Sequence, residues 1–395
     1  MKILVINSGS SSIKYQLIDM PGRNVICSGM VERIGLKNSM IHFKSDKNKI
    51  DEIYNISNHE VGLEKISELI LNKEIGVLRD PGDIYAVAHR VVHGGSTFSR
   101  TTVIDQNVKD IINELFELAP LHNPANLKGI EVSEKVFPNA KQIAVFDTAF
   151  HQSIPEVAYR YAIPNKFFID NKIRVYGFHG TSHKYVSEKA IEYLQKKKTK
   201  IVSIHLGNGC SITAIENGRS KDHSLGSSTM NGLIMGTRSG DIDHSVIFYL
   251  VNSLGYTLDE VNIILQKESG MLGLTGYSDL REIEEEAQQG NRTCQLALEI
   301  NAYRIKKYIG AYATAMNGLD AIVFTAGIGE NSSIIRDLVC RDLDFIGIEL
   351  DATQNLLRSN EIREINASNS KVKVLVIPTN EELEIAKQAY ELLNQ

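Results

Sequence analysis

The sequence predicts an α/β protein built from two halves of similar plan. In each half, strand-like apolar runs are followed by helical patterns, which is typical of the α/β class. The chain has 395 residues, a length that favours two domains over a single core. The segment Lys2–Gly9 also aligns with Lys200–Gly207, with identical residues at four of eight positions. This repeat predicts two related halves with a boundary near residue 150.

The first half opens with three strand-like runs, and two further apolar runs accompany two helical patterns. The predicted elements are strands at 2–7, 12–19, 25–34, 84–88 and 142–146, and helices at 109–118 and 127–137. This order of strands and helices is that of a mixed sheet covered by helices.

The second half repeats this order with more helices. It is predicted to contain a hairpin at 200–216, helices at 184–197, 242–254, 258–268, 279–289 and 294–317, and strands at 321–325 and 372–377. The turn at 326–331 follows the strand at 321–325. Thr379 with Glu382 three residues later then predicts a capping box that opens a terminal helix.

Composition excludes several classes of function. The net charge of −5 and the pI near 6.2 argue against a protein that binds nucleic acid or anionic membranes. We find no signal-peptide core and no run approaching eighteen apolar residues, so we expect a cytosolic protein without a membrane span. The four cysteines are scattered, which predicts neither a disulfide framework nor a zinc site.

The turn Asn7–Lys14 between two apolar runs is the first candidate site. It offers backbone N–H groups, the hydroxyls of Ser10 and Ser12, the amide of Asn7 and the cation of Lys14, which together suit phosphate oxygens. The alternative is a polar turn that binds nothing.

Two related halves that each offer such a hairpin resemble the actin, hexokinase and sugar-kinase superfamily. The resemblance implies two duplicated actin-like (ribonuclease H-like) domains with a nucleotide cleft between them. It places the N-terminal domain at 1–150, completed by a C-terminal helix at about 379–395, and a C-terminal domain with most nucleotide contacts at 151–378. The chain has no Gly-Lys dipeptide and no Gly-x-Gly-x-x-Gly after a strand, so competing nucleotide motifs are missing.

Six short segments rich in Arg, Asp, His and Gly narrow this resemblance. They are His89–Gly95, Phe146–His151, Tyr176–His183, His205–Gly209, Met235–Asp243 and Phe324–Ser332. With the first hairpin they resemble the acetate kinase family, in matching order over nearly the full chain.

The resemblance implies an enzyme that reversibly transfers the ATP γ-phosphoryl group to acetate by direct in-line displacement, giving acetyl phosphate and ADP. It implies Mg2+ (or Mn2+) as the cofactor and a homodimer. Phosphoryl transfer depends on positioning and charge neutralisation, for which the chain has suitable residues. The alternatives are a propionate or other short-chain carboxylate kinase, a pyrophosphate-linked acetate kinase and an actin-like ATP-binding structural protein.

The resemblance assigns catalytic roles to Arg90, Asp147, His179 and Arg238, and Mg2+ binding to Asn7, Asp147 and Glu381. Taken alone, the arginines could form structural ion pairs, and His179 could be a core histidine. Asp147 and Glu381 could be helix-terminal acids.

The remaining assignments concern the two substrates. The carboxylate is expected to contact Arg90, Val92, Leu121, Phe178 and Thr229. The nucleotide is expected to contact Asn7, Ser10, Ser12, Lys14, His205, Leu206, Gly207, Asn208, Gly209, Gly327, Ile328, Gly329, Glu330 and Asn331. Thr229 stands where the family pattern has a proline, which makes the substrate preference less certain than the reaction.

Two histidine pairs, His89/His93 and His179/His183, have the i, i+4 spacing that could hold zinc on a helix. Apolar neighbours and glycines predict no helix at either pair, so we expect no zinc site there.

Overall fold

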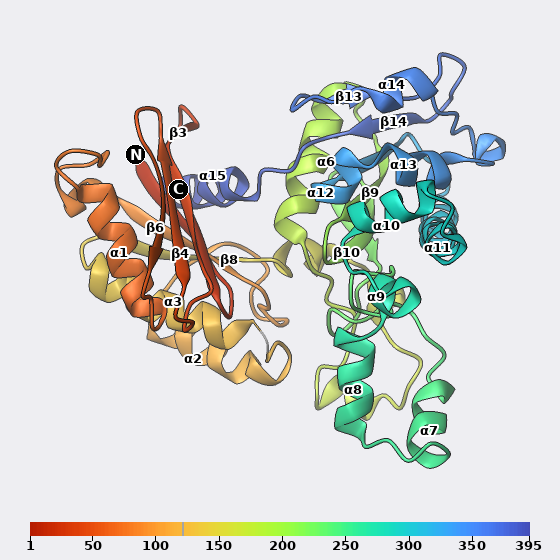
Figure 1. Cartoon of the computed structure of the whole chain (residues 1–395), viewed down its shortest axis with the longest axis horizontal. Helices are drawn as coiled ribbons and strands as arrows, with labels where there is room; N and C mark the ends of the chain where they lie inside the picture. Colours follow the sequence, from red (N-terminus) through yellow and green to blue (C-terminus); the bar gives the residue numbers. More distant parts are fainter. Residues whose placement is uncertain (121) are drawn as a thin grey trace. The chain divides into compact units, whose positions relative to one another are not determined.

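The computed structural model describes residues 1–120 and 122–395, and the chain divides into two compact units. Unit 1 comprises Met1–Phe150 and Asn380–Gln395, and unit 2 comprises His151–Thr379. Each unit contains one mixed sheet with helices packed against it (Figure 1). The predicted α/β class is confirmed. Leu121, predicted to contact the carboxylate, lies outside the described residues.

The sheet of unit 1 has eight strands in the order β5-β4-β3-β2-β1-β6-β8-β7. Strands β1 to β5 form an antiparallel meander, whereas β1, β6 and β8 run parallel. The strands are β1 (Lys2–Ser8), β2 (Ser12–Asp19), β3 (Asn24–Glu32), β4 (Ser39–Ser45), β5 (Lys49–Tyr54), β6 (Ala86–Val91), β7 (Thr102–Val103) and β8 (Lys141–Phe146).

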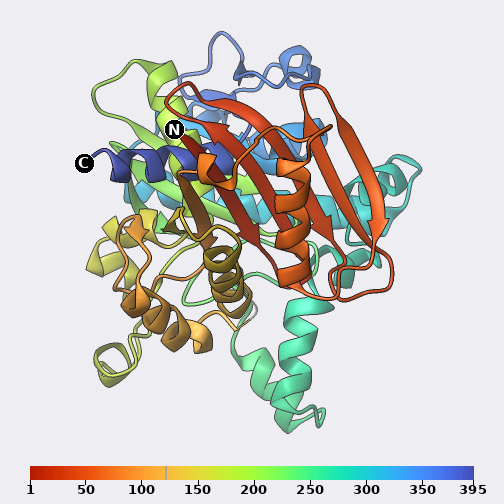
Figure 2. The same ribbon diagram turned by 90° about the vertical axis from the view of Figure 1, so that its left-hand side faces the viewer.

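Helices cover both faces of this sheet. They are α1 (His59–Leu71), α2 (Gln106–Glu114), α3 (Asn123–Val136) and α15 (Glu381–Leu393), with 3-10 turns at Pro81–Asp83 and Leu115–Glu117. Side chains alternate along β1: Leu4 shares a core with α1 and α3, whereas Val5 shares one with α15. Figure 2 views this sheet with α1 lying across its strands.

The cap of α15 differs from the predicted capping box. Asn380 is the N-cap residue, and its side-chain oxygen accepts a hydrogen bond from the Leu383 N–H at 3.0 Å. The Thr379 hydroxyl instead hydrogen-bonds Ser182 Oγ at 3.0 Å. The terminal helix is therefore present as predicted, but its capping residue and its first turn lie one position later.

The sheet of unit 2 has the order β11-β10-β9-β12-β14-β13. Its strands are β9 (Lys200–Leu206), β10 (Cys210–Glu216), β11 (Arg219–His223), β12 (Ala321–Thr325), β13 (Arg363–Glu364) and β14 (Lys373–Val376). Strands β9, β10 and β11 form an antiparallel meander, and β9, β12 and β14 run parallel. The arrangement of β1, β2, β3, β6 and β8 in unit 1 is thus repeated, as the sequence repeat predicts.

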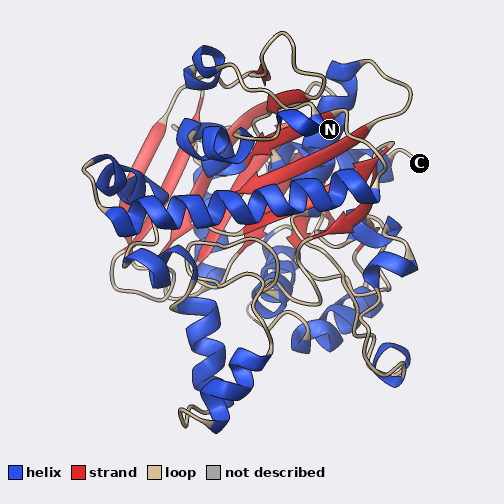
Figure 3. Ribbon diagram, turned by 90° about the vertical axis from the view of Figure 1, so that its right-hand side faces the viewer, coloured by secondary structure: helices blue, strands red, loops and turns tan. Residues whose placement is uncertain are grey.

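Unit 2 holds most of the helices. They are α4 (Glu156–Tyr159), α5 (Lys166–Ile169), α6 (Gly180–Leu194), α7 (Ser245–Asn252), α8 (Leu258–Lys267), α9 (Gly270–Thr275), α10 (Leu280–Gln288), α11 (Arg292–Ala315), α12 (Ala326–Asn331), α13 (Ser333–Cys340) and α14 (Ala352–Leu356), with a 3-10 turn at Asp344–Ile346. A further 3-10 turn, Ala149–Ser153, spans the boundary between the two units. The long helix α11 lies across one face of the sheet and contacts β9 and β10 (Figure 3). Within the described ranges, no helix combines the length and apolar character that crossing a bilayer requires.

Candidate active site

The ends of three parallel strands bring predicted catalytic and Mg2+-binding residues of unit 1 together. Asn7 lies near the end of β1, Arg90 near the end of β6, and Asp147 directly after β8. Glu381 is the first residue of α15. The carboxyl ends of parallel strands meet at one edge of a sheet, where ligands commonly bind.

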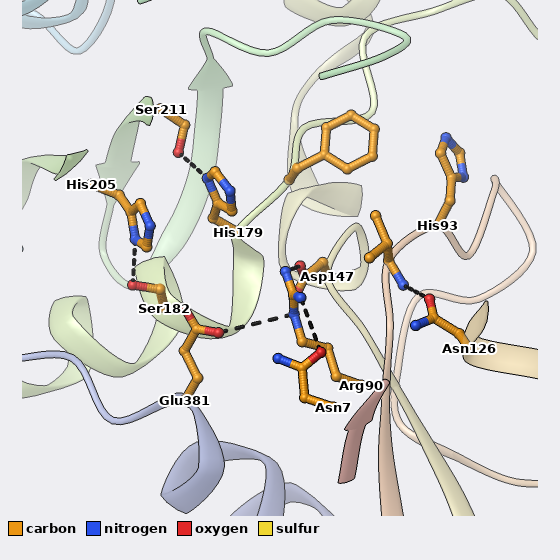
Figure 4. Close-up of polar contacts among 12 residues, drawn as sticks. Asn7, Arg90, His93, Asn126, Asp147, His179, Ser182, His205, Ser211 and Glu381 are labelled. Carbon is orange, nitrogen blue, oxygen red and sulfur yellow. Dashed lines mark hydrogen bonds and ion pairs between the residues drawn. The ribbon is translucent and has the colours of Figure 1, made fainter. Parts of the chain in front are cut away.

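Arg90 is the centre of this group, with the three other side chains directed at its guanidinium (Figure 4). Its Nη2 donates to Asp147 Oδ2 at 2.5 Å, and its Nη1 donates to Asn7 Oδ1 at 3.4 Å. Its Nε lies 3.9 Å from Glu381 Oε2. Asp147 is 1% exposed and Arg90 is 19% exposed, so this ion pair is largely shielded from water.

Carboxylates outnumber guanidinium groups in this cluster. Burial alone would lower the pKa of Arg90, but Asp147 and Glu381 outweigh it and hold that pKa above its ordinary value. Burial raises the pKa of Glu381; Arg90 opposes the shift, and Asp147 and Glu382 add to it. Carboxylates in this state favour a further cation.

The donor set suits Mg2+. Asn7, Asp147 and Glu381 offer oxygen atoms, and Mg2+ is usually held by one or two carboxylates together with waters and substrate phosphates. Among the described residues, no three His, Cys, Asp or Glu side chains gather into a metal-binding group by themselves. A site of this kind therefore depends on oxygens beyond the carboxylates.

Two asparagines of α3 hold the segment that follows Arg90. Asn126 Oδ1 accepts the Val92 N–H at 3.1 Å, and its Nδ2 donates to the Ser8 carbonyl at 2.8 Å. Asn123 bonds both the N–H and the carbonyl of His93, at 3.1 and 3.0 Å. Both asparagines are buried, and Val92 is buried with them. The sequence analysis missed both; their only local signal is a pair of poor helix formers three residues apart.

The first hairpin forms the predicted tight turn. The Gly9 N–H donates to the Ser12 carbonyl at 2.8 Å, and the Gly9 carbonyl accepts a hydrogen bond from His59 Nε2 at 2.7 Å. Ser10 is exposed, and Ser12 is half-buried. The predicted phosphate-binding cation, Lys14, lies opposite Asn7 in the ladder and forms an ion pair with Glu382 at 2.5 Å.

In unit 2, five histidines gather around the start of α6. We refer to them as the histidine cluster: His151, His179, His183, His205 and His223. The rings of His179 and His205 stack with centroids 4.4 Å apart, and those of His151 and His223 lie 4.1 Å apart. Burial and the neighbouring imidazoles lower the pKa values of His183 and His223 well below the ordinary range, so both rings stay neutral.

Two members of the cluster hold the Phe178 backbone. The Phe178 N–H donates to His223 Nε2 at 3.0 Å, and His151 Nε2 donates to the Phe178 carbonyl at 2.9 Å. A peptide N–H can only donate and a carbonyl can only accept, so the backbone fixes the tautomers of both rings. Phe178 is 2% exposed, and His179, which follows it, adopts a left-handed conformation with φ of 54°.

His179 and His205 are each bonded to a serine (Figure 4). His179 Nδ1 lies 2.9 Å from Ser211 Oγ, and His205 Nδ1 lies 2.9 Å from Ser182 Oγ. Helix α6 begins at Gly180, so His183 is helical and the prediction of no helix there was wrong.

Arg238 differs from Arg90 in its partners. Its Nη1 donates to the Thr229 carbonyl at 3.1 Å and lies 3.7 Å from Met235 Sδ. Within residues 1–120 and 122–395, no carboxylate forms an ion pair with it, and burial lowers its pKa. A partly buried guanidinium without an acid partner favours binding an anion. Thr229 contributes its backbone carbonyl to this arrangement.

A cavity of about 640 Å³ lies within unit 2, next to the turn of the second hairpin. Its lining includes six residues predicted to contact the nucleotide: Leu206, Gly207, Asn208, Gly327, Ile328 and Asn331. The sequence analysis missed the contribution of α10, which brings Asp279, Arg281 and Glu284 to the same cavity. The segment after β12 was predicted as a turn, but it is helix α12.

Three other predicted nucleotide contacts have different surroundings. The Gly329 carbonyl accepts a hydrogen bond from the buried Arg336 at 2.9 Å. Glu330 Oε1 accepts the Thr379 N–H at 3.0 Å, which ties α12 to the end of unit 2. Gly209 lies against His179, since a Cβ at this glycine would be 3.4 Å from the imidazole ring.

Comparison with known proteins gives one family. Residues 2–387 match the acetokinase family. The chain is 65% identical over 393 residues to an acetate kinase of Flavobacterium johnsoniae, covering 100% of both chains. It superimposes on the crystal structure of Porphyromonas gingivalis acetate kinase with a TM-score of 0.94, 44% identity and 99% coverage of both chains. It also superimposes on a propionate kinase from Francisella tularensis with a TM-score of 0.92, 41% identity and 98% coverage of both chains.

Proposed function

The chain belongs to the acetokinase family, and we propose that it reversibly transfers the γ-phosphoryl group of ATP to acetate, giving acetyl phosphate and ADP. The observation that carries this proposal is Arg238, a guanidinium without a carboxylate partner among the described residues, in the unit that holds the 640 Å³ cavity. A cavity of this volume suits a nucleoside, and an unpaired guanidinium suits the anion that such a substrate brings.

In the proposed reaction, a carboxylate oxygen of acetate attacks the γ-phosphorus in line with the departing ADP oxygen. Arg90, Arg238 and the His179 imidazole donate hydrogen bonds to the phosphoryl oxygens as charge spreads over them. Mg2+ bound by Asn7, Asp147 and Glu381 would neutralise phosphate charge. No covalent intermediate on the enzyme is needed.

We propose that unit 1 is the N-terminal actin-like domain completed by α15, and that unit 2 carries most of the nucleotide contacts. The six cavity residues that the sequence analysis assigned to the nucleotide support this division. They also argue against pyrophosphate as the donor, because a pyrophosphate site needs no space for a nucleoside.

Acetate is the proposed preferred acid, with the buried Val92 and Phe178 beside its methyl group. Propionate is the second candidate, because Thr229 replaces a proline of the family pattern. An ordinary residue leaves this wall less rigid than proline does.

A homodimer is proposed from the family and from the α7–α8 hairpin. Several large apolar side chains on and around this hairpin are exposed: Ile242, Phe248, Tyr249, Leu254 and Leu258. Exposed large apolar side chains gathered on one hairpin are a feature of protein interfaces. The cytosolic location stays a prediction from the sequence.

The proposed function is tested by incubating the purified protein with ATP, Mg2+ and a panel of acids from formate to butyrate, and trapping acyl phosphates as hydroxamates. We expect the highest kcat/KM with acetate and a measurable value with propionate. A folded protein that binds ATP but phosphorylates none of these acids would contradict the proposal and favour an actin-like binding protein.

A further inference from the structure

A chain of four side chains leads from the core of unit 2 to His179. Ser203 Oγ lies 2.8 Å from His183 Nδ1, and His183 Nε2 lies 2.7 Å from Ser211 Oγ. Ser211 Oγ then lies 2.9 Å from His179 Nδ1, the contact drawn in Figure 4. Ser203, His183 and Ser211 are each 0% exposed, whereas His179 is partly exposed.

The direction of the hydrogen bonds along this chain is constrained. Ser211 Oγ contacts two imidazole nitrogens but carries one proton, so it donates to one ring and accepts from the other. His183 is neutral because burial and the neighbouring His151 and His205 lower its pKa well below the ordinary range. It therefore carries its single proton on either Nδ1 or Nε2, and only two arrangements of the whole chain are consistent.

Ser203 distinguishes the two arrangements. In the first, the Ser203 hydroxyl donates to His183 Nδ1, His183 Nε2 donates to Ser211, and the Ser211 hydroxyl donates to His179 Nδ1. In the second, His179 Nδ1 donates to Ser211, the Ser211 hydroxyl donates to His183 Nε2, and His183 Nδ1 donates to Ser203. The buried Ser203 hydroxyl proton then needs another acceptor. In the described part of the chain, His183 Nδ1 is the hydrogen-bond partner of Ser203 Oγ, and no second acceptor is present. A buried donor without an acceptor is costly, so the first arrangement is favoured.

We propose that Ser211, oriented by His183 and Ser203, is a positioning residue that keeps His179 Nδ1 a hydrogen-bond acceptor, so that the ring carries its proton on Nε2. This inference rests on the proposed function, in which His179 donates a hydrogen bond to the transferring phosphoryl group. An Nδ1 that accepts from Ser211 leaves Nε2–H as the donor of the neutral ring. The stacked ring of His205 limits the movement of this imidazole.

The tautomer can be measured without reference to activity. In the 15N-histidine-labelled protein, Nδ1 of His179 is expected to show the pyridine-like shift of an acceptor and Nε2 the pyrrole-like shift of a protonated nitrogen. The signals are assigned by their loss in His179→Asn. In Ser211→Ala the two tautomers are expected to become mixed. A pyrrole-like Nδ1 in the unaltered protein, or an unchanged tautomer in Ser211→Ala, would overturn the proposal.

Kinetics provide the second readout. Loss of one hydrogen bond of ordinary strength corresponds to about tenfold in rate, so Ser211→Ala is expected to lower kcat about tenfold with little change in the KM for ATP. Ser203→Ala is expected to lower kcat by roughly threefold, because it removes only the more distant bond. In the double variant the loss is expected to equal that of Ser211→Ala alone, because Ser203 acts through Ser211.

Independent structural effects would instead multiply in the double variant, and that outcome would contradict the relay. Ser187→Ala is the matched control: Ser187 is a buried serine of α6 whose hydroxyl donates to the Lys184 carbonyl at 2.9 Å. It is expected to leave the His179 tautomer and kcat unchanged. If Ser211→Ala fails to fold, Ser203→Ala tests the same tautomer shift. If the unaltered protein phosphorylates no acid, the proposed function fails while the tautomer measurement still decides this inference.

Discussion

Replacement of each arginine by alanine is expected to separate catalysis from stability. Arg90 forms an ion pair with Asp147, which is 1% exposed, whereas no described carboxylate pairs with Arg238. Losing one preorganised donor to a transferring group typically lowers kcat by about a hundredfold or more, roughly 3 kcal/mol. Both Arg90→Ala and Arg238→Ala are therefore expected to lose kcat on this scale.

Their effects on folding are expected to differ. Arg90→Ala removes the cation that pairs with the buried Asp147 and lies near the partly exposed Glu381, and breaking a buried pair from one side costs about 3–5 kcal/mol. In a unit of this size, each kcal/mol lowers Tm by about 2–4 °C, so the expected loss is roughly 6–20 °C. Arg238→Ala removes one bond to a carbonyl and is expected to change Tm by only a few degrees, about 1 kcal/mol.

The assay combines hydroxamate kinetics with calorimetric melting, and lysine variants serve as the control for charge. Lysine is expected to restore part of the stability lost in Arg90→Ala but little of the kcat, because a point charge cannot form the planar fork. Near-normal kcat in both alanine variants would show that these arginines are structural. If Arg90→Ala and Arg238→Ala lowered Tm equally, the ion pair of Arg90 with the buried Asp147 would not contribute the expected extra stability.

Three further predictions concern the nucleotide cavity, the carboxylate site and acid stability. Gly327→Leu is expected to raise the KM for ATP without lowering Tm, because a Cβ at Gly327 meets nothing within 4 Å and the residue lines the cavity; an unchanged KM would place the nucleotide elsewhere. Thr229→Pro keeps the carbonyl that Arg238 uses and is expected to shift the kcat/KM ratio of acetate over propionate several-fold, within the range of about 1–3 kcal/mol for one methylene. An unchanged ratio would show that residue 229 does not line the acid site. Burial lowers the pKa of His89 from 6.5 to about 4, so the unfolded chain binds a proton before the folded protein does, and stability is lost as pH falls from 6.5 towards 4. Between pH 7.5 and pH 5, the unaltered protein is expected to lose about 2 kcal/mol more than His89→Gln in denaturant titrations; equal losses would contradict the neutral buried state of His89.

The periodic elements of the fold could be predicted from the sequence, and the missed elements have physical reasons. Strand β5 is largely exposed on both faces, so it has no apolar alternation to detect. Helix α1 is the exception, because its apolar pattern, with Leu63, Ile66 and Ile70 buried, is a signal for a helix that the sequence does contain. Helix α6 begins with glycine and small polar residues, which locally favour a loop, and packing of the histidine cluster outweighs that preference.

The sequence predicts the site residues at strand ends but not the side chains that hold them in place. Residues that lie at strand ends, such as Arg90 and Asp147, stand out beside glycines and apolar runs. The hydrogen bonds that support these residues cannot be recognised in the sequence, because they join residues far apart in the chain. Asn126, for example, donates to the Ser8 carbonyl across 118 positions. The contacts of His183 with Ser203 and Ser211 likewise depend on how α6 packs against β9 and β10. No spacing in the sequence encodes such pairs.

The proposed reaction requires that an acetate oxygen attacks the γ-phosphorus of ATP. This attack can be followed by 31P NMR of the reaction of [18O2]acetate with ATP and Mg2+. Direct attack is expected to give ADP and acetyl phosphate in which the oxygen bridging carbon and phosphorus is 18O, seen as an isotope shift of the acetyl phosphate signal. Formation of 18O-labelled AMP with pyrophosphate, or of unlabelled inorganic phosphate and ADP without acetyl phosphate, would contradict it.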